Sequence, residues 1–201
     1  MDKPVKKPVG SARERIISVA SDLFYYQGIR ATGINEVIEK SGVAKATFYN
    51  HFPSKDDLVL VYLQAMRANV FEHVEQAIAS QPSPLTRLLV VIEAVGPWME
   101  DTDYRGCPFI NMASEIPDPD SPLRKQAVAI YSEVGNKVQE LATELIASDP
   151  EKYGHLDPEK LANDYMMVYT GAIALTGIYH ADWPVEQALK TVRRLIGETG
   201  G

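Results

Sequence analysis

The chain has a single cysteine, Cys107, among its 201 residues. An intramolecular disulfide is therefore impossible, and a fold that relies on its apolar core in a reducing compartment is expected. No run of about 18 apolar residues occurs, which excludes a conventional membrane-spanning helix. No apolar stretch follows the basic N-terminal residues, so we expect no secretory signal. These absences predict a cytoplasmic protein without a membrane partner.

Motifs for catalysis and metal binding are absent as well. The four histidines form no H-E-x-x-H pattern and no paired Cys/His spacing. There is no G-x-S-x-G elbow, Walker loop or dinucleotide fingerprint. We therefore expect no metal, no cofactor and no enzymatic activity. Sustained alternation of apolar and polar residues is also missing, and without that strand pattern the sequence predicts an all-α fold.

Charge is present but unevenly divided. The whole chain carries a net charge of −7. Residues 1–55 hold nine Lys/Arg and five Asp/Glu, a net +4, whereas residues 56–201 hold eleven basic and twenty-two acidic residues, a net −11. A basic end on an acidic body favours an oriented encounter with a polyanion such as DNA.

The basic end contains the pattern of a helix-turn-helix. Ser11 and Glu14 form a capping box for a first helix, which Gly28 ends. A second helix runs from about residue 33 to Gly42, where a left-handed conformation makes the turn. A third, short helix covers about residues 45–51. Such a helix after a tight glycine turn is how a recognition helix enters the major groove of DNA.

Helical spacing continues through the rest of the chain. Pro53 stops the third helix, and Ser54 with Asp57 caps a long fourth helix that reaches about Ser80. This long helix begins beside the recognition helix, so we expect it to act as the lever between the two ends of the protein. Further helices are predicted at about 84–100, 107–116, 121–148, 158–181 and 184–196.

The N-terminal segment resembles the TetR family of bacterial transcriptional regulators. The resemblance covers about residues 11–60 and rests on L-F-Y-Y-Q-G, R-A-T, G-V-A-K-A-T-F-Y-N-H-F and P-S-K-D-D-L. It implies a flexible basic arm at 1–10, a DNA-binding domain at 11–56 with its helix-turn-helix at about 33–52, and a helical effector-binding and dimerisation domain at 57–201. The implied activity is that of a regulator, most simply a repressor that a small molecule releases from its operator.

Carried over by position, the family pattern assigns seven residues to DNA. Thr32 and Lys55 correspond to phosphate contacts, Tyr49 and His51 to backbone contacts, and Lys45, Ala46 and Thr47 to positions that read base edges. Asn50 is an eighth predicted DNA contact, because its side chain suits phosphates and base edges. The family usually has a hydroxyl residue where this chain has Ala44. Ala44 cannot cap the recognition helix, so one of its N–H groups must be satisfied by other means.

Aromatic and methionine side chains in the acidic body could line a pocket for an apolar or aromatic effector. We expect the effector to contact some of the following residues, although most side chains of this kind belong to ordinary cores: Trp98, Cys107, Phe109, Met112, Tyr131, Met166 and Tyr169. Cys107 follows Arg105-Gly106 at a helix start, where a thiolate is favoured. Two hypotheses stay open for it, an inert buried thiol and a sensor of oxidants or electrophiles.

Small and apolar residues in the last two predicted helices suggest a homodimer. Two such helices from each chain could close a four-helix interface, or the same residues could belong to the core of one chain. The predicted interface residues are Gly171, Ala174, Leu175, Ile178, Val185, Leu189 and Val192. A dimer would place its recognition helices about 34–36 Å apart and predicts a near-palindromic double-stranded operator. An alternative to the effector-controlled regulator is an architectural DNA-binding protein without an effector.

Overall fold

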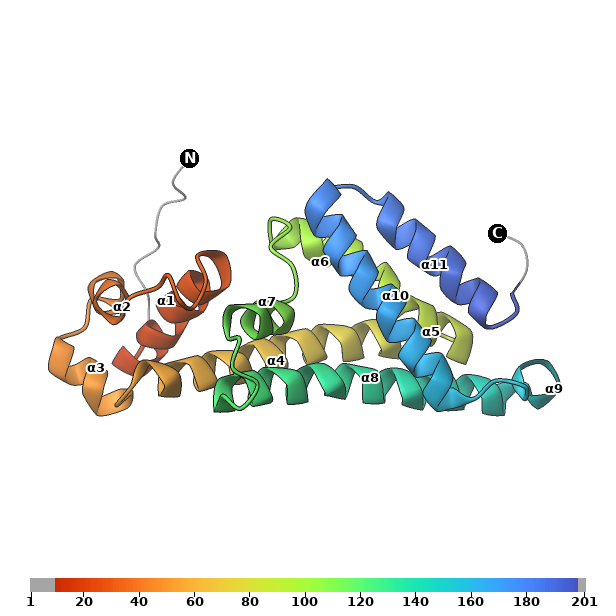
Figure 1. Ribbon diagram of the computed structural model, residues 1–201, viewed down its shortest axis with the longest axis horizontal. Helices are drawn as coiled ribbons and strands as arrows, with labels where there is room; N and C mark the ends of the chain where they lie inside the picture. The colour runs from red at the N-terminus through yellow and green to blue at the C-terminus, as the bar shows by residue number, and fades with distance from the viewer. Residues whose placement is uncertain (1–9, 199–201) are drawn as a thin grey trace. The chain divides into compact units, whose positions relative to one another are not determined.

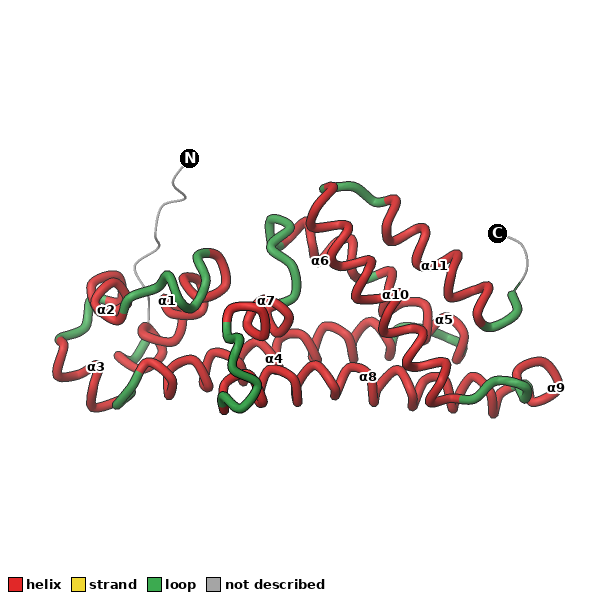
Figure 2. Tube along the Cα trace, viewed as in Figure 1, coloured by secondary structure: helices red, strands yellow, loops and turns green. Residues whose placement is uncertain are grey.

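The computed structural model describes residues 10–198. Over this range the chain forms eleven helices and no strand, which confirms the all-α prediction (Figure 2). The predicted basic arm at 1–10 lies outside the described residues except for Gly10. The helices are α1 Ala12–Tyr26, α2 Ile34–Ser41, α3 Lys45–His51, α4 Lys55–Ala79, α5 Pro84–Glu93, α6 Val95–Asp101, α7 Pro108–Glu115, α8 Pro122–Ser148, α9 Pro150–Tyr153, α10 Pro158–Tyr179 and α11 Trp183–Leu195.

Local capping chemistry sets several of these ends. Ser11 accepts a hydrogen bond from the backbone N–H of Glu14, whose carboxylate accepts one from the N–H of Ser11. Ser54 and Asp57 make the same reciprocal pair before α4. Both capping boxes are as predicted, since each needs only residues three positions apart.

The structure differs from the predicted helices at two places. The helix expected over 84–100 is interrupted at Ala94 and becomes α5 and α6. Pro97 explains the break, because it has no N–H to donate to the carbonyl of Glu93 and its ring crowds the preceding turn. The second difference is a helix that was not predicted, the single turn α9, whose N-terminus Asp149 caps by accepting a hydrogen bond from the N–H of Lys152.

The helices group into two compact units, of which the first comprises residues 10–67 and 108–128. In it α1 packs against α2 and α3 (Figure 1). The rings of Phe24 and Tyr62 meet edge to face at 5.6 Å, which joins α1 to α4. Besides the predicted domain at 11–56, this unit contains α4 up to Arg67, α7 and the first turns of α8.

The second unit comprises residues 68–107 and 129–198. Here α10 and α11 lie side by side, α11 also packs on α5, and α10 on α6 (Figure 1). The buried phenol of Tyr165 donates a 2.8 Å hydrogen bond to the carbonyl of Leu88 and so joins α10 to α5. Burial raises the pKa of Tyr165 well above its ordinary value, so this phenol remains a neutral donor.

The loop from α6 toward α7 has an unusual backbone. Asp103 and Tyr104 adopt positive φ angles of 55° and 57°, and Gly106 follows at 86°. The ring of Tyr104 stacks on the imidazole of His180 at 4.2 Å. Because non-glycine residues rarely adopt this conformation, surrounding contacts such as this stack must hold the loop.

Candidate functional site

Helix α3 has one buried face and one exposed face. Phe48 and Phe52 are 0% and 2% exposed and anchor α3 to the first unit. The guanidinium of Arg13 lies 5.7 Å from the ring of Phe52, which ties α1 to the end of α3. A seven-residue helix is too short to be stable by itself, so these anchors position α3. Five of the residues predicted to contact DNA are exposed, Lys45, Ala46, Tyr49, Asn50 and His51, and Thr47 is half-buried.

The turn before α3 is fixed from two sides. Gly42 ends α2 in the left-handed conformation, with φ 64° and ψ 32°, as predicted. The Arg15 guanidinium on α1 donates a 3.1 Å hydrogen bond to the carbonyl of Ser41. Since Ser41 is the last residue of α2, this bond holds the turn at the point from which α3 starts.

The first turn of α3 has no side-chain cap. Ala44 is the N-cap residue, with φ −69° and ψ 147°, and makes no capping hydrogen bond. This confirms the expectation that the alanine leaves an N–H group for another acceptor. A DNA phosphate is one acceptor suited to an exposed helix N-terminus.

Thr32 differs from the expectation. Its side chain is 1% exposed, and its hydroxyl donates to the carbonyls of Gly28 at 2.8 Å and Leu23 at 3.3 Å. The hydroxyl therefore fastens the end of the α1–α2 loop to Leu23 of α1 and to Gly28 at the start of the loop, and it does not face solvent, where a phosphate would bind. The sequence pattern places Thr32 correctly before α2 but does not show which way its side chain points.

Lys55 begins α4 and is partly buried. Burial lowers the pKa of its ammonium, whereas the neighbouring carboxylates of Asp56 and Glu115 raise it. Lys55 thus lies at the edge of the first unit beside acidic groups that a phosphate would have to displace or share.

Helix α7 contributes a residue to this surface that sequence reasoning missed. The Glu115 carboxylate accepts a 2.9 Å hydrogen bond from the backbone N–H of Arg30 in the α1–α2 loop. Residues 30 and 115 are 85 positions apart, and no local pattern connects them. The family resemblance gave no signal either, because it covered only about residues 11–60.

The seven predicted effector contacts fall into both units. Phe109 and Met112 lie in the first unit, and Trp98, Cys107, Tyr131, Met166 and Tyr169 lie in the second. Phe109, Met112, Cys107 and Tyr169 are buried. Within the second unit the Tyr131 hydroxyl pairs with the Thr170 hydroxyl at 2.5 Å, and burial raises the pKa of both Tyr131 and Tyr169.

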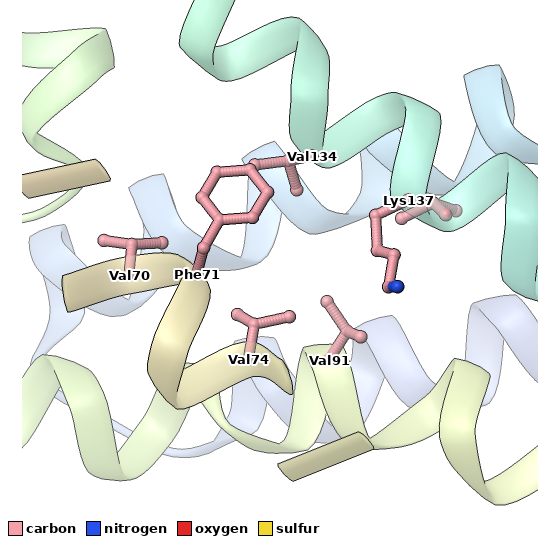
Figure 3. Close-up of a pocket in the computed structure, with 7 residues that line it drawn as sticks. Val70, Phe71, Val74, Val91, Val134 and Lys137 are labelled. Carbon is pink, nitrogen blue, oxygen red and sulfur yellow. The ribbon is translucent and has the colours of Figure 1, made fainter. Parts of the chain in front are cut away.

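The second unit has a small pocket that none of these seven residues lines. Its lining comes from α4, α5 and α8 and is apolar apart from one lysine: Val70, Phe71, Val74, Val91, Val134, Lys137 and Val138 (Figure 3). The Lys137 ammonium forms ion pairs with Glu75 at 2.9 Å and Glu140 at 3.4 Å, which raise its pKa. Sequence reasoning missed these valines because they follow the same helical spacing as any core residue.

The predicted dimer residues also divide into two groups. Ala174, Leu175 and Ile178 are exposed on α10, and Gly171 and Leu189 are half-buried. Val185 and Val192 are buried in the single chain, on the helix that packs against α10 and α5. These two valines are therefore used in the core of one chain, the alternative that the sequence left open.

Other site types find no support in residues 10–198. This part of the chain contains no group of three or more His, Cys, Asp or Glu residues that could hold a metal ion. Within the same residues, no helix has both the length and the apolarity needed to cross a membrane.

Comparison with known proteins gives two family matches. The model for bacterial regulatory proteins of the tetR family matches residues 16–62, and the model for the tetracyclin repressor-like C-terminal domain matches residues 84–192.

Individual relatives extend this picture. The uncharacterized HTH-type transcriptional regulator YxaF of Bacillus subtilis is 27% identical over 61% of this chain and 65% of its own length. The HTH-type transcriptional regulator LmrA of the same organism is 28% identical over 65% of this chain and 71% of its own length. The crystal structure of SCO4454, a TetR-family transcriptional regulator from Streptomyces coelicolor, superposes with a TM-score of 0.83 and 27% identity, covering 94% of this chain and 96% of that one. With both halves matched, the chain belongs to the TetR family of bacterial regulatory proteins.

Proposed function

We propose that this protein is a homodimeric transcriptional repressor. It reads a near-palindromic operator with α3 and leaves the operator when a small apolar molecule binds its C-terminal helices. The observation that carries the proposal is the division of α3 into two faces. Phe48 and Phe52 hold the helix in place, and Lys45, Tyr49 and Asn50 face outward as donors and acceptors for DNA.

The first experiment is a selection of binding sites from random-sequence duplex DNA, followed by affinity measurements on the selected duplex. Sequence-specific repression requires a tight site with two related half-sites about one helical turn apart. An architectural DNA-binding protein would instead bind all duplexes weakly, with a steep salt dependence. Failure to enrich any sequence would overturn the proposal.

Lys55 binds a DNA phosphate in this proposal. We predict that Lys55→Ala weakens operator binding and reduces the slope of log K against log salt by about 1, because the variant neutralises one phosphate fewer. Lys160→Ala on α10 is the matched control, because it removes an exposed lysine from the second unit. An unchanged salt slope in Lys55→Ala would contradict the phosphate role.

The pocket between α4, α5 and α8 is the proposed effector site, and because its cavity volume is about 10 Å³, the effector must widen it on binding. Its valine and phenylalanine lining favours an apolar molecule. The effector must bind the released state better than the operator-bound state, since only differential affinity shifts the equilibrium. A thermal-shift screen of small apolar and aromatic compounds, repeated with Val74→Trp to fill the pocket, tests this site. Shifts that persist in Val74→Trp would place the effector elsewhere.

The electrophile-sensor alternative depends on Cys107. Cys107 is 6% exposed, which leaves a reagent little access and favours the inert-thiol hypothesis. Cys107→Ser should therefore leave operator binding, its response to effectors and its sensitivity to alkylating reagents unchanged. Loss of alkylation sensitivity in this variant would support the sensor.

A further inference from the structure

Glu115 is the last residue of α7, and its carboxylate lies against the α1–α2 loop. One of its oxygens, Oε2, accepts the backbone N–H of Arg30 at 2.9 Å. Arg30 stands three residues before Gly33, the N-cap of α2. The C-terminal family model, which covers residues 84–192, includes α7. In the structure, however, α7 belongs to the same compact unit as the helix-turn-helix.

The α1–α2 loop has a glycine, Gly28, beside the Glu115 carboxylate. Gly28 has a φ of 100°, and a Cβ atom at this position would come within 3.0 and 3.2 Å of the two Glu115 oxygens. Glycine adopts this φ without strain, whereas a Cβ atom would also have to displace the carboxylate by a few tenths of an ångström. The same carboxylate raises the pKa of Lys55 against the effect of burial, so its field reaches the start of α4.

The end of α7 is itself held in place. The Arg124 guanidinium, in the first turn of α8, donates to the carbonyl of Ala113 and, at 2.8 Å, to the carbonyl of Ile116. These carbonyls flank Glu115, so Arg124 fixes the stretch of backbone that carries the carboxylate. The chain enters α7 directly from Cys107 in the second unit and returns to that unit along α8 after Val128.

We propose that Glu115 is a positioning residue for DNA binding. By holding the Arg30 amide it sets the α1–α2 loop, and with it the N-terminus of α2, in the arrangement that reads the operator. A rearrangement of the second unit that draws on either end of α7 would release this loop, in addition to any movement of α4. The inference rests on the proposed function, because it concerns the same DNA-binding surface.

The test measures operator affinity by fluorescence anisotropy, with a labelled duplex that the wild-type protein has selected from random-sequence DNA. Glu115→Ala removes the acceptor and should weaken binding by about tenfold. Glu115→Gln keeps an amide oxygen that can accept the Arg30 N–H, so it should restore affinity to within about threefold of wild type. Ser114→Ala, on the exposed neighbouring position, is the control and should bind like wild type.

A second readout separates positioning from general stability. Hydrogen exchange of the Arg30 amide should accelerate by about tenfold or more in Glu115→Ala and slow again in Glu115→Gln, with unchanged exchange in α1 and α3. A residue that merely stabilised the fold would change exchange throughout the unit. Should Glu115→Ala fail to fold, Arg124→Ala supplies both readouts, because it loosens the end of α7 and leaves the loop residues intact.

Failure of the proposed function and failure of the role of Glu115 give different results. If wild-type protein enriches no duplex, the proposed function fails. If wild type binds its operator and Glu115→Ala binds equally well, or the Arg30 amide exchanges at the wild-type rate, only the role of Glu115 is overturned. Affinity in Glu115→Gln as low as in Glu115→Ala would overturn the hydrogen-bond mechanism.

Discussion

The reciprocal bonds between Ser11 and Glu14 at the start of α1 have a consequence for stability at acidic pH. The N–H and hydroxyl of Ser11 hold the pKa of Glu14 below its ordinary value of 4.5 in the folded protein. A carboxyl group whose pKa is lowered by folding stabilises the protein above its unfolded pKa, and this contribution is lost as pH falls through the folded value.

We therefore predict that the free energy of unfolding falls less on acidification in Glu14→Gln than in wild type. Glutamine can still accept the N-cap N–H but does not titrate. The stability difference between the two proteins should be present near neutrality and disappear as pH falls below 4.5. Because Glu14 is fully exposed, the effect is small. Urea unfolding over a pH series measures it, and parallel pH curves for the two proteins would contradict the prediction.

At the scale of single residues, sequence reasoning succeeded where a side chain and its partner are close along the chain. The capping box at Ser11, the left-handed Gly42 and the missing cap at Ala44 each depend on residues within three or four positions. The sequence did not show that the Thr32 hydroxyl turns inward to the carbonyls of Leu23 and Gly28, or that Glu115 contacts Arg30. Both depend on how distant segments pack, which local spacing does not encode.

Among the elements, α3 combines a well-anchored side with a poorly capped start. Its N-cap residue already has the extended conformation that a capping serine adopts, with ψ 147°. Only the acceptor oxygen is missing. A serine at this position could therefore bond the free N–H of α3 without any change in backbone.

We predict that Ala44→Ser raises the free energy of unfolding by about 1 kcal/mol. Ala46→Ser is the matched control, because it places the same side chain inside the first turn, where it has no capping role and lowers helix propensity slightly. Chemical denaturation of both variants checks the prediction. Equal stability of the two would show that another group already satisfies the N-terminal N–H groups of α3.

Most element boundaries follow from proline, glycine and capping residues, so the helices could be predicted to within a few residues. The interruption at Ala94 shows the remaining difficulty. Pro97 indicates a break, but the expected helix 84–100 treated it as tolerated, and only packing decides between a kink and two separate helices. In the structure α5 packs on α11 and α6 packs on α10, which gives the two pieces different partners.

For the whole molecule, an apolar stripe on α10 supports the proposed homodimer. Met167 and Ile178 are 77% and 70% exposed, and Ala174 and Leu175 are exposed between them. Met167, Ala174 and Ile178 are seven and four residues apart, which places them on one face of the helix, with Leu175 beside them. A stripe of this kind at a helix surface is typical of an interface between chains.

We predict that Ile178→Lys converts the protein into a monomer and weakens operator binding by at least about a hundredfold, since one half-site then has to be bound alone. Asn136→Lys introduces the same charge at an exposed polar position of α8 and should remain dimeric. Analytical ultracentrifugation gives the association state, and anisotropy gives the affinity. A dimer that persists in Ile178→Lys would locate the interface on another surface.

The all-α class and the helix-turn-helix could be predicted from the whole sequence, because periodicity and turn residues carry that information. The pocket and the membership of each unit could not. The pocket valines have the same spacing as core valines, and the grouping of α7 with the N-terminal helices depends on contacts such as Glu115 with Arg30.

The chain passes between the two compact units three times, within α4, after Cys107 and within α8. These three crossings limit which segments can be exchanged with those of another protein. A chimera joined at residue 67 would carry the recognition helix but leave behind α7 and Arg124, so the Arg30 amide would meet a foreign carboxylate or none. If Glu115 positions the α1–α2 loop as proposed, a transplant that keeps the original DNA preference should move residues 108–128 together with residues 10–67.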